Sequence, residues 1–129
     1  MLDSKQKKEL LNSFSVIEYR IKELSEELEY IEANINNGAN LKTMKEMERI
    51  ANLIDEEKLE LKQIQLRVML ATKNLSDITE RRIIHLKYIG KKEGLYHKTL
   101  PLWKIANELG YSLDRINHIH VDALRHLEL

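Results

Sequence analysis

Apolar residues recur at alternating steps of four and three along the first quarter of the chain. They lie at Leu10, Phe14, Ile17, Ile21, Leu24, Leu28, Ile31 and Ile35. This spacing is typical of the seam of an α-helix that packs along another helix. The side chain of Asp3 or Ser4 can accept hydrogen bonds from the first free amides, and Asn36, Asn37 and Gly38 favour a helix exit. The pattern predicts a helix of about 32 residues that needs a partner.

A second helix is predicted for residues 41–73. Its apolar stripe consists of Met44, Met47, Ala51, Ile54, Leu61, Ile64, Val68, Ala71 and, just beyond, Leu75. The connection at residues 36–40 is short, and short connections favour antiparallel neighbours. The first 75 residues are therefore expected to form a long antiparallel helical hairpin, coiled-coil-like in its packing.

Three leucines of the second helix, Leu59, Leu66 and Leu70, lie off that stripe. A single hairpin partner leaves them exposed, so a further contact is expected. It is either a second copy of the chain or the C-terminal part folding back. We predict a homodimer, with pairing in cis or in trans left open and an unassembled hairpin as the alternative. The residues assigned to dimerisation are Phe14, Ile17, Ile21, Leu24, Leu28, Ile31, Leu59, Leu66 and Leu70.

The third segment begins near residue 76. Thr79 is the predicted cap of a helix over residues 80–89, and Gly90 is its stop. An irregular, basic stretch follows at residues 91–99, and Pro101 falls at the start of the next helix, where its missing amide does no harm. The chain is thus predicted to divide into residues 1–75, for self-association, and a separate C-terminal module at residues 76–129.

Residues 102–127 have the pattern of a helix-turn-helix. Four inward positions, Ile105, Leu109, Ile116 and Ile119, hold two short helices at a steep angle, and Ala106 is small where they cross. Gly110 allows the positive φ of the turn, and Ser112 caps the second helix. The outer face of that helix then carries the four residues expected to contact base edges, which are Leu113, Asp114, Asn117 and His118.

Composition narrows the function classes. The chain has 129 residues, 21 basic and 21 acidic side chains and no Cys, which excludes disulfides, Cys-ligated zinc and thiol catalysis. No secretory signal and no membrane span is apparent, so a cytoplasmic protein is expected. No phosphate-binding loop, nucleophile elbow or zinc-protease motif occurs, so we expect neither an enzyme nor a cofactor. His118 and His120 point about 200° apart on a helix and cannot chelate one metal ion, so no metal site is expected.

The segments 79–89, 105–112 and 115–127 together resemble region 4 of sigma factors, over about residues 76–128. A long helical part before such an end is similar to the small late-transcription regulators of Gram-positive phages, of the ArpU/RinA/LtrC-like type. The resemblance implies a bacterial host cell and promoter-proximal DNA. It also implies base contacts at Leu113, Asp114, Asn117 and His118, and places Ser112 and Arg115 beside the phosphate backbone. Sigma factors have Arg at two of those four base-contacting positions, so a different target sequence is implied.

Phosphate contacts supply most of the affinity of such modules. The candidates are Lys91, Lys92, Lys98, Thr99, Trp103, Lys104 and Arg115, together with Ser112. Residues 76–129 carry a formal charge of only +2, so paired modules are expected to bind better than one. We expect a double-stranded DNA-binding transcriptional regulator, an activator of phage late genes, with RNA polymerase as a further partner. The alternatives are a DNA-packaging factor like a small terminase, and a module that docks on RNA polymerase without binding DNA.

Overall fold

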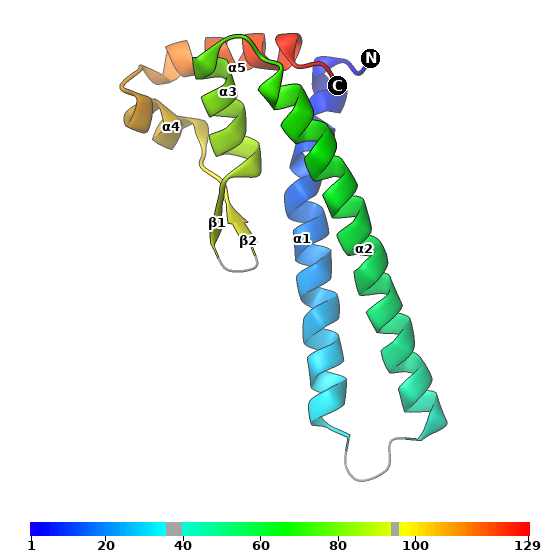
Figure 1. Ribbon diagram of the computed structural model, residues 1–129. Helices are drawn as coiled ribbons and strands as arrows, with labels where there is room; N and C mark the ends of the chain where they lie inside the picture. The colour runs from blue at the N-terminus through cyan, green and yellow to red at the C-terminus, as the bar shows by residue number, and fades with distance from the viewer. Residues whose placement is uncertain (36–39, 94–95) are drawn as a thin grey trace. The chain divides into compact units, whose positions relative to one another are not determined.

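The computed structural model describes residues 1–35, 40–93 and 96–129, with the backbone alone at residues 92, 93, 96 and 97. The described chain is predominantly helical, which confirms the all-α class in outline (Figure 1). Its elements, in chain order, are α1 (Ser4–Ala33), α2 (Leu41–Lys73), α3 (Ile78–Ile84), the π-helical turn η1 (His85–Ile89), β1 (Lys91–Glu93), β2 (Tyr96–Lys98), α4 (Leu102–Leu109) and α5 (Leu113–His126). None of the described helices combines the length and the apolar content that a membrane span requires.

Contacts between residues divide the chain into two compact units. One unit combines Met1–Phe14 with Ile64–Leu129, and the other consists of Ser15–Gln63. The first unit therefore joins the beginning of α1 and the end of α2 to every C-terminal element. The boundary predicted at residue 75 separates a part for self-association from a part for DNA binding. This division of function stays a prediction.

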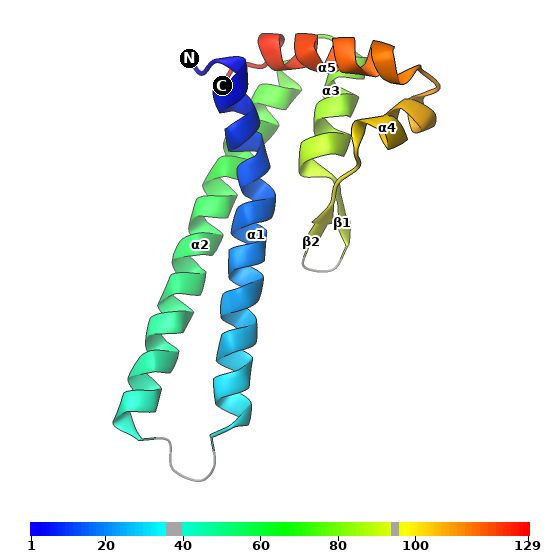
Figure 2. The same cartoon turned by 180° about the vertical axis from the view of Figure 1, so that it is seen from behind.

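In the unit Ser15–Gln63, segments of α1 and α2 lie side by side (Figures 1 and 2). Ile17, Ile50 and Ile54 are buried there, and Arg20 of α1 lies 3.4 Å from the Glu57 carboxylate of α2. Most of the predicted connection at residues 36–40, including the predicted helix exit at Asn36, Asn37 and Gly38, lies outside the described residues.

One position of the predicted stripes is wrong. Met44, expected to pack in the core, is 57% exposed, whereas Ile50, outside the stripe, is fully buried. Leu11, outside the predicted seam, is also buried, and its neighbour Leu10 is half-buried. The reason is that an ideal α-helix drifts by about 20° per heptad, so a strict heptad does not keep one line along a straight helix.

One helix start also differs from the prediction. The cap of α3 is Asp77, whose Oδ1 accepts from the Glu80 amide at 2.9 Å, and not Thr79. Pro101 lies at the start of α4, as predicted, and is its extended N-cap residue. At α1, Asp3 is the cap: its Oδ1 accepts from the Gln6 amide at 2.8 Å, and Gln6 Oε1 accepts from the Asp3 amide at 3.0 Å. Such a reciprocal pair satisfies two otherwise free donors.

The stretch predicted to be irregular contains a two-stranded antiparallel sheet, in which Lys91 pairs with Lys98 and Lys92 with His97. Gly90 joins η1 to this sheet with φ 72° and ψ −177°, a region that only glycine adopts readily. A Cβ on Gly90 would lie 2.3 Å from the Lys98 carbonyl oxygen. Gly90 is therefore the residue that allows the sheet to start directly after the π-turn.

Gly90 and Gly110, the glycines with positive φ in the described part of the chain, provide a matched pair of variants. A Cβ on Gly110 meets nothing within 4 Å, whereas one on Gly90 collides with backbone. Gly90→Ala is expected to lower the free energy of unfolding by about 3 kcal/mol, and Gly110→Ala by about 1 kcal/mol, in urea titrations. Equal losses for the two variants would contradict this account of Gly90.

Candidate nucleic-acid interface

The candidate interface is built on α4, a three-residue turn and α5. Gly110 closes α4 in the left-handed conformation with φ 75° and ψ 26°, as the sequence predicts. Ser112 is extended, and its Oγ accepts from the Arg115 amide at 3.2 Å, which begins α5. The turn is thus fixed by one glycine and one hydroxyl, and its backbone needs no long-range contact.

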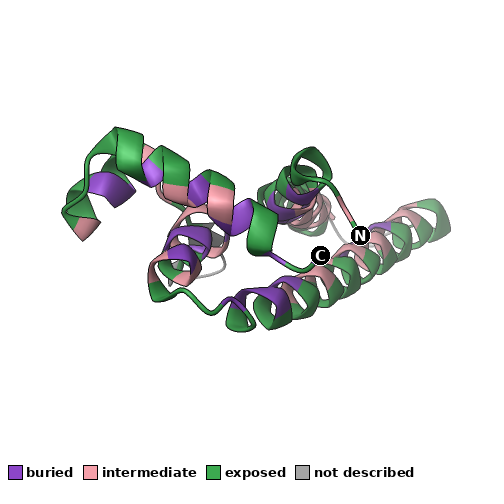
Figure 3. Ribbon diagram, turned by 90° about the horizontal axis from the view of Figure 1, so that it is seen from above, coloured by how far each residue is buried: buried purple, intermediate pink, exposed green. Residues whose placement is uncertain are grey.

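A small core beneath these helices sets their angle. Ile83 of α3, Ile105 and Ala106 of α4, and Ile116 of α5 are buried together. Leu109 and Ile119, the other two predicted inward positions, pack against this cluster and are partly buried. In Figure 3 buried and exposed stretches alternate along α5. This alternation is expected of a helix that packs on one side and is open to solvent on the other.

The open side of α5 carries all four residues predicted to contact bases. Leu113 is 46% exposed and Asn117 is exposed, and the side chains of Asp114 and His118 are 91% and 78% exposed. Asp114 Oδ2 lies 3.8 Å from His118 Nε2, one turn further along the helix, a contact that becomes an ion pair when the imidazole is protonated. The structure therefore brings the four residues to one face at the beginning of α5.

Cationic groups flank this face. The Lys104 ammonium lies 5.5 Å from the centre of the Trp103 ring, and the Arg115 guanidinium lies 5.4 Å from that of Tyr111. Each aromatic ring is exposed and holds its cation near the start of α4 or α5. Because a helix start also presents free amides, both ends can face a phosphate.

The remaining phosphate candidates are spread over the sheet and the loop before α4. Lys91, Lys98 and Thr99 are exposed, and the Lys92 side chain lies outside the described residues. The hydroxyl of Ser112 is occupied by the Arg115 amide, although a hydroxyl can still donate its own hydrogen to a phosphate oxygen.

The dimerisation candidates fall into two groups. Phe14 and Ile17 are buried within the chain itself, and Ile21, Leu24, Leu28 and Ile31 are half-buried. Leu59, Leu66 and Leu70 of α2 are 58%, 54% and 63% exposed. Only the second group presents apolar side chains to solvent.

Of the other two histidines of α5, His120 points to the interior of the unit, whereas the side chain of His126 is 58% exposed. His120 is buried, and its Nε2 lies 2.6 Å from the Tyr88 hydroxyl, with the two rings stacked at 5.6 Å between centres. Burial lowers the pKa of His120 to about 4, and the charges of Lys87 and Lys8 add to this effect. Burial also raises the pKa of Tyr88 to about 12. Both groups are therefore neutral at pH 7, and the phenol can donate to an unprotonated Nε2.

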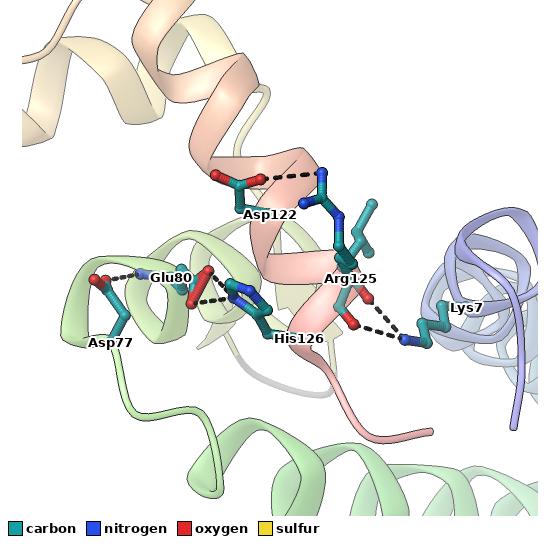
Figure 4. A network of polar contacts seen from close by, with 7 residues as sticks. Lys7, Asp77, Glu80, Asp122, Arg125 and His126 are labelled. Carbon is teal, nitrogen blue, oxygen red and sulfur yellow. Dashed lines mark hydrogen bonds and ion pairs between the residues drawn. The ribbon is translucent and has the colours of Figure 1, made fainter.

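The far end of α5 is held by polar contacts to α3 and α1 (Figure 4). His126 Nδ1 lies 2.7 Å from Glu80 Oε1, and Asp122 pairs with Arg125 at 3.3 Å. The buried ammonium of Lys7 donates to the carbonyl oxygens of Leu124 at 2.9 Å and Arg125 at 3.4 Å. A cation at a helix C-terminus satisfies free carbonyls and complements the helix dipole.

Sequence reasoning missed these supporting residues. Tyr88 and His120 lie 32 positions apart, Glu80 and His126 lie 46 apart, and Lys7 and Leu124 lie 117 apart. No local pattern connects such pairs, and one sequence offers no covariation. Within the described part of the chain no group of three His, Cys, Asp or Glu residues gathers as metal ligands would.

The low pKa of His120 makes stability depend on pH. Between pH 6.5 and 4 the unfolded chain binds a proton at this imidazole that the folded chain does not, so acid favours unfolding. Stability from this group is complete above pH 6.5 and is lost as the pH falls through 4. After allowance for solvent screening, the loss is expected to be about 2 kcal/mol.

The measurement is the free energy of unfolding of the wild type and His120→Gln at pH 7 and pH 4.5. Gln keeps a hydrogen-bonding group but does not titrate, so the variant is expected to lose less stability on acidification. His85→Gln, at an exposed histidine, is the control and should follow the wild type. Parallel pH curves for the wild type and His120→Gln would contradict the assignment.

Comparisons of the chain with family models, with curated proteins and with solved structures found no match.

Proposed function

We propose that this protein binds double-stranded DNA sequence-specifically and regulates transcription, with α5 lying in the major groove. The observation that carries the proposal is the open face at the beginning of α5, where Leu113, Asp114, Asn117 and His118 project together beside flanking cations. A helix presented in this way by a preceding helix and a tight turn is the geometry of a helix-turn-helix. The resemblance to sigma factor region 4 supports the same module, and with it the role of a phage late-gene activator.

The chemistry of the four side chains suggests which bases they prefer. Asn117 can make a bidentate pair with adenine, and His118 can donate to a purine acceptor. Asp114 can accept from the amino group of cytosine, and Leu113 can contact only a thymine methyl group. A target that differs from the usual −35 hexamer follows from this set.

The helices α1 and α2 form the proposed self-association region. Because the module has few surplus positive charges, two modules in one complex raise the effective concentration of the second on DNA. Residues 1–75 are therefore assigned to assembly and residues 76–129 to DNA.

The test is selection of bound duplexes from a random pool by the full chain, with and without RNA polymerase. We expect enrichment of a shared sequence by the protein alone. Absence of any enrichment would overturn the proposal, and enrichment that requires polymerase would favour docking on polymerase. A ring of many subunits in solution would favour the packaging factor, since a regulator of this kind needs only a dimer.

A further inference from the structure

The outer face of α2 carries an exposed apolar row that the fold does not use. Leu59, Leu66, Met69 and Leu70 are each more than half exposed. At about 100° per residue these four side chains lie within an arc of about 100° on the helix. They form a stripe of the width that helices bury against one another, and we call it the α2 outer stripe.

Charge is segregated along the helix that carries the α2 outer stripe. Residues 55–60 contain four acidic residues and one lysine, whereas residues 61–73 contain three basic residues and no acidic one. Glu57 is paired with Arg20 within the chain. Among the residues that the structure describes, no ion pair joins the other seven charged residues of this stretch, which are Asp55, Glu56, Lys58, Glu60, Lys62, Arg67 and Lys73. The acidic stretch 55–60 and the basic stretch 61–73 of α2 are therefore both open to a partner.

We infer that the α2 outer stripe is where two copies of this chain associate, with their α2 helices antiparallel. In an antiparallel pair the acidic half of each helix faces the basic half of the other. A parallel pair would place like charges together, which is destabilising. A second copy of the chain therefore satisfies both the apolar row and the charges, at one surface.

One register places an apolar pair and a charged pair opposite each other at the same time. When Leu59 of one copy faces Met69 of the other, Asp55 comes opposite Lys73. Asp55 and Lys73 are 18 residues apart, which is five helical turns, so they lie on the same side of the helix. The twofold symmetry of the pair makes each of these contacts occur twice.

This self-association does not depend on DNA. Among the predicted dimerisation residues, Phe14 and Ile17 are covered within their own chain, whereas Leu59, Leu66 and Leu70 are available. The interface is small, so association is expected to be weak and to depend on protein concentration.

Sedimentation equilibrium of the full chain tests whether copies associate. We expect the average mass to rise with concentration from the 15.3 kDa of the monomer toward twice that value. Leu66→Glu combined with Leu70→Glu should weaken association at least tenfold. Val16→Glu, at an equally exposed apolar residue of α1, should leave it unchanged. A chain that stays monomeric at every concentration would overturn the inference. The α2 outer stripe would then be a surface for a different protein.

Cysteine crosslinking tests the orientation, because the chain has no cysteine of its own. A mixture of Leu59→Cys and Met69→Cys chains should form a disulfide between the two variants. Leu59→Cys alone should form almost none, since its two copies lie about 15 Å apart along an antiparallel pair. Efficient crosslinking of Leu59→Cys alone would mean parallel helices and would overturn the inference.

Charge exchange provides an independent readout. Asp55→Lys should weaken association several-fold, and so should Lys73→Glu. The two changes in one chain should restore it, because the pairs are re-formed with reversed sign. Failure of the double variant to recover would contradict the register. DNA binding by a chain that fails all three tests would leave the proposed function in place.

Discussion

Asn117→Ala combined with His118→Ala is expected to lower affinity for the selected DNA site about 100-fold, while affinity for random duplexes changes little. Each base contact contributes about 1–3 kcal/mol of discrimination between bases, and both side chains are exposed and lie outside the core. The variant should therefore lose its preference for the selected sequence and keep its affinity for random DNA. Titration of labelled specific and random duplexes at one fixed salt concentration measures both affinities.

The matched control is Asn52→Ala combined with His85→Ala. It removes the same two side-chain types from exposed positions on α2 and η1, away from the beginning of α5. This variant should bind both duplexes as the wild type does. If the two double variants affected DNA binding equally, with helical content intact by circular dichroism, the beginning of α5 would not be the part that recognises bases.

Ile105→Ala is expected to lower the free energy of unfolding by about 3 kcal/mol. The side chain is fully buried between α3, α4 and α5, so its truncation loses apolar burial and leaves a cavity. Because this core sets the angle at which α5 is presented, DNA binding should fall together with the folded fraction. Urea unfolding followed by the fluorescence of Trp103, the single tryptophan of the chain, measures this loss next to the altered site.

Ile78→Ala is the control for that change. Ile78 is 65% exposed at the start of α3, and its truncation should cost less than about 0.5 kcal/mol. Similar losses at Ile78 and Ile105 would mean that the small core of Ile83, Ile105, Ala106 and Ile116 does not support the interface.

The candidate interface was predictable because its determinants are local. Gly110 and Ser112 fix the turn between α4 and α5 within three residues, and the inward side chains repeat at helical spacing. Once those positions are set, the outward face of α5 follows from the geometry of the helix. The exposure of Leu113, Asp114, Asn117 and His118 is therefore a consequence of the local pattern.

Features that depend on distant residues were not predictable. Lys7 acts on the end of α5 from the opposite end of the chain, and Tyr88 meets His120 only after α3 and α5 have packed. The short sheet escaped prediction for a related reason: its strands are three residues each and mostly charged, and such strands carry no hydrophobic alternation.

The proposed recognition of DNA requires that α5 lies in the major groove with its beginning against base edges. Methylation interference tests this directly, since methyl groups on guanine N7 lie in the major groove and those on adenine N3 lie in the minor groove. We predict that N7 methylation within the selected site blocks binding of the wild-type chain and that N3 methylation has little effect. Binding that tolerates N7 methylation throughout the site and is blocked by N3 methylation would contradict the account.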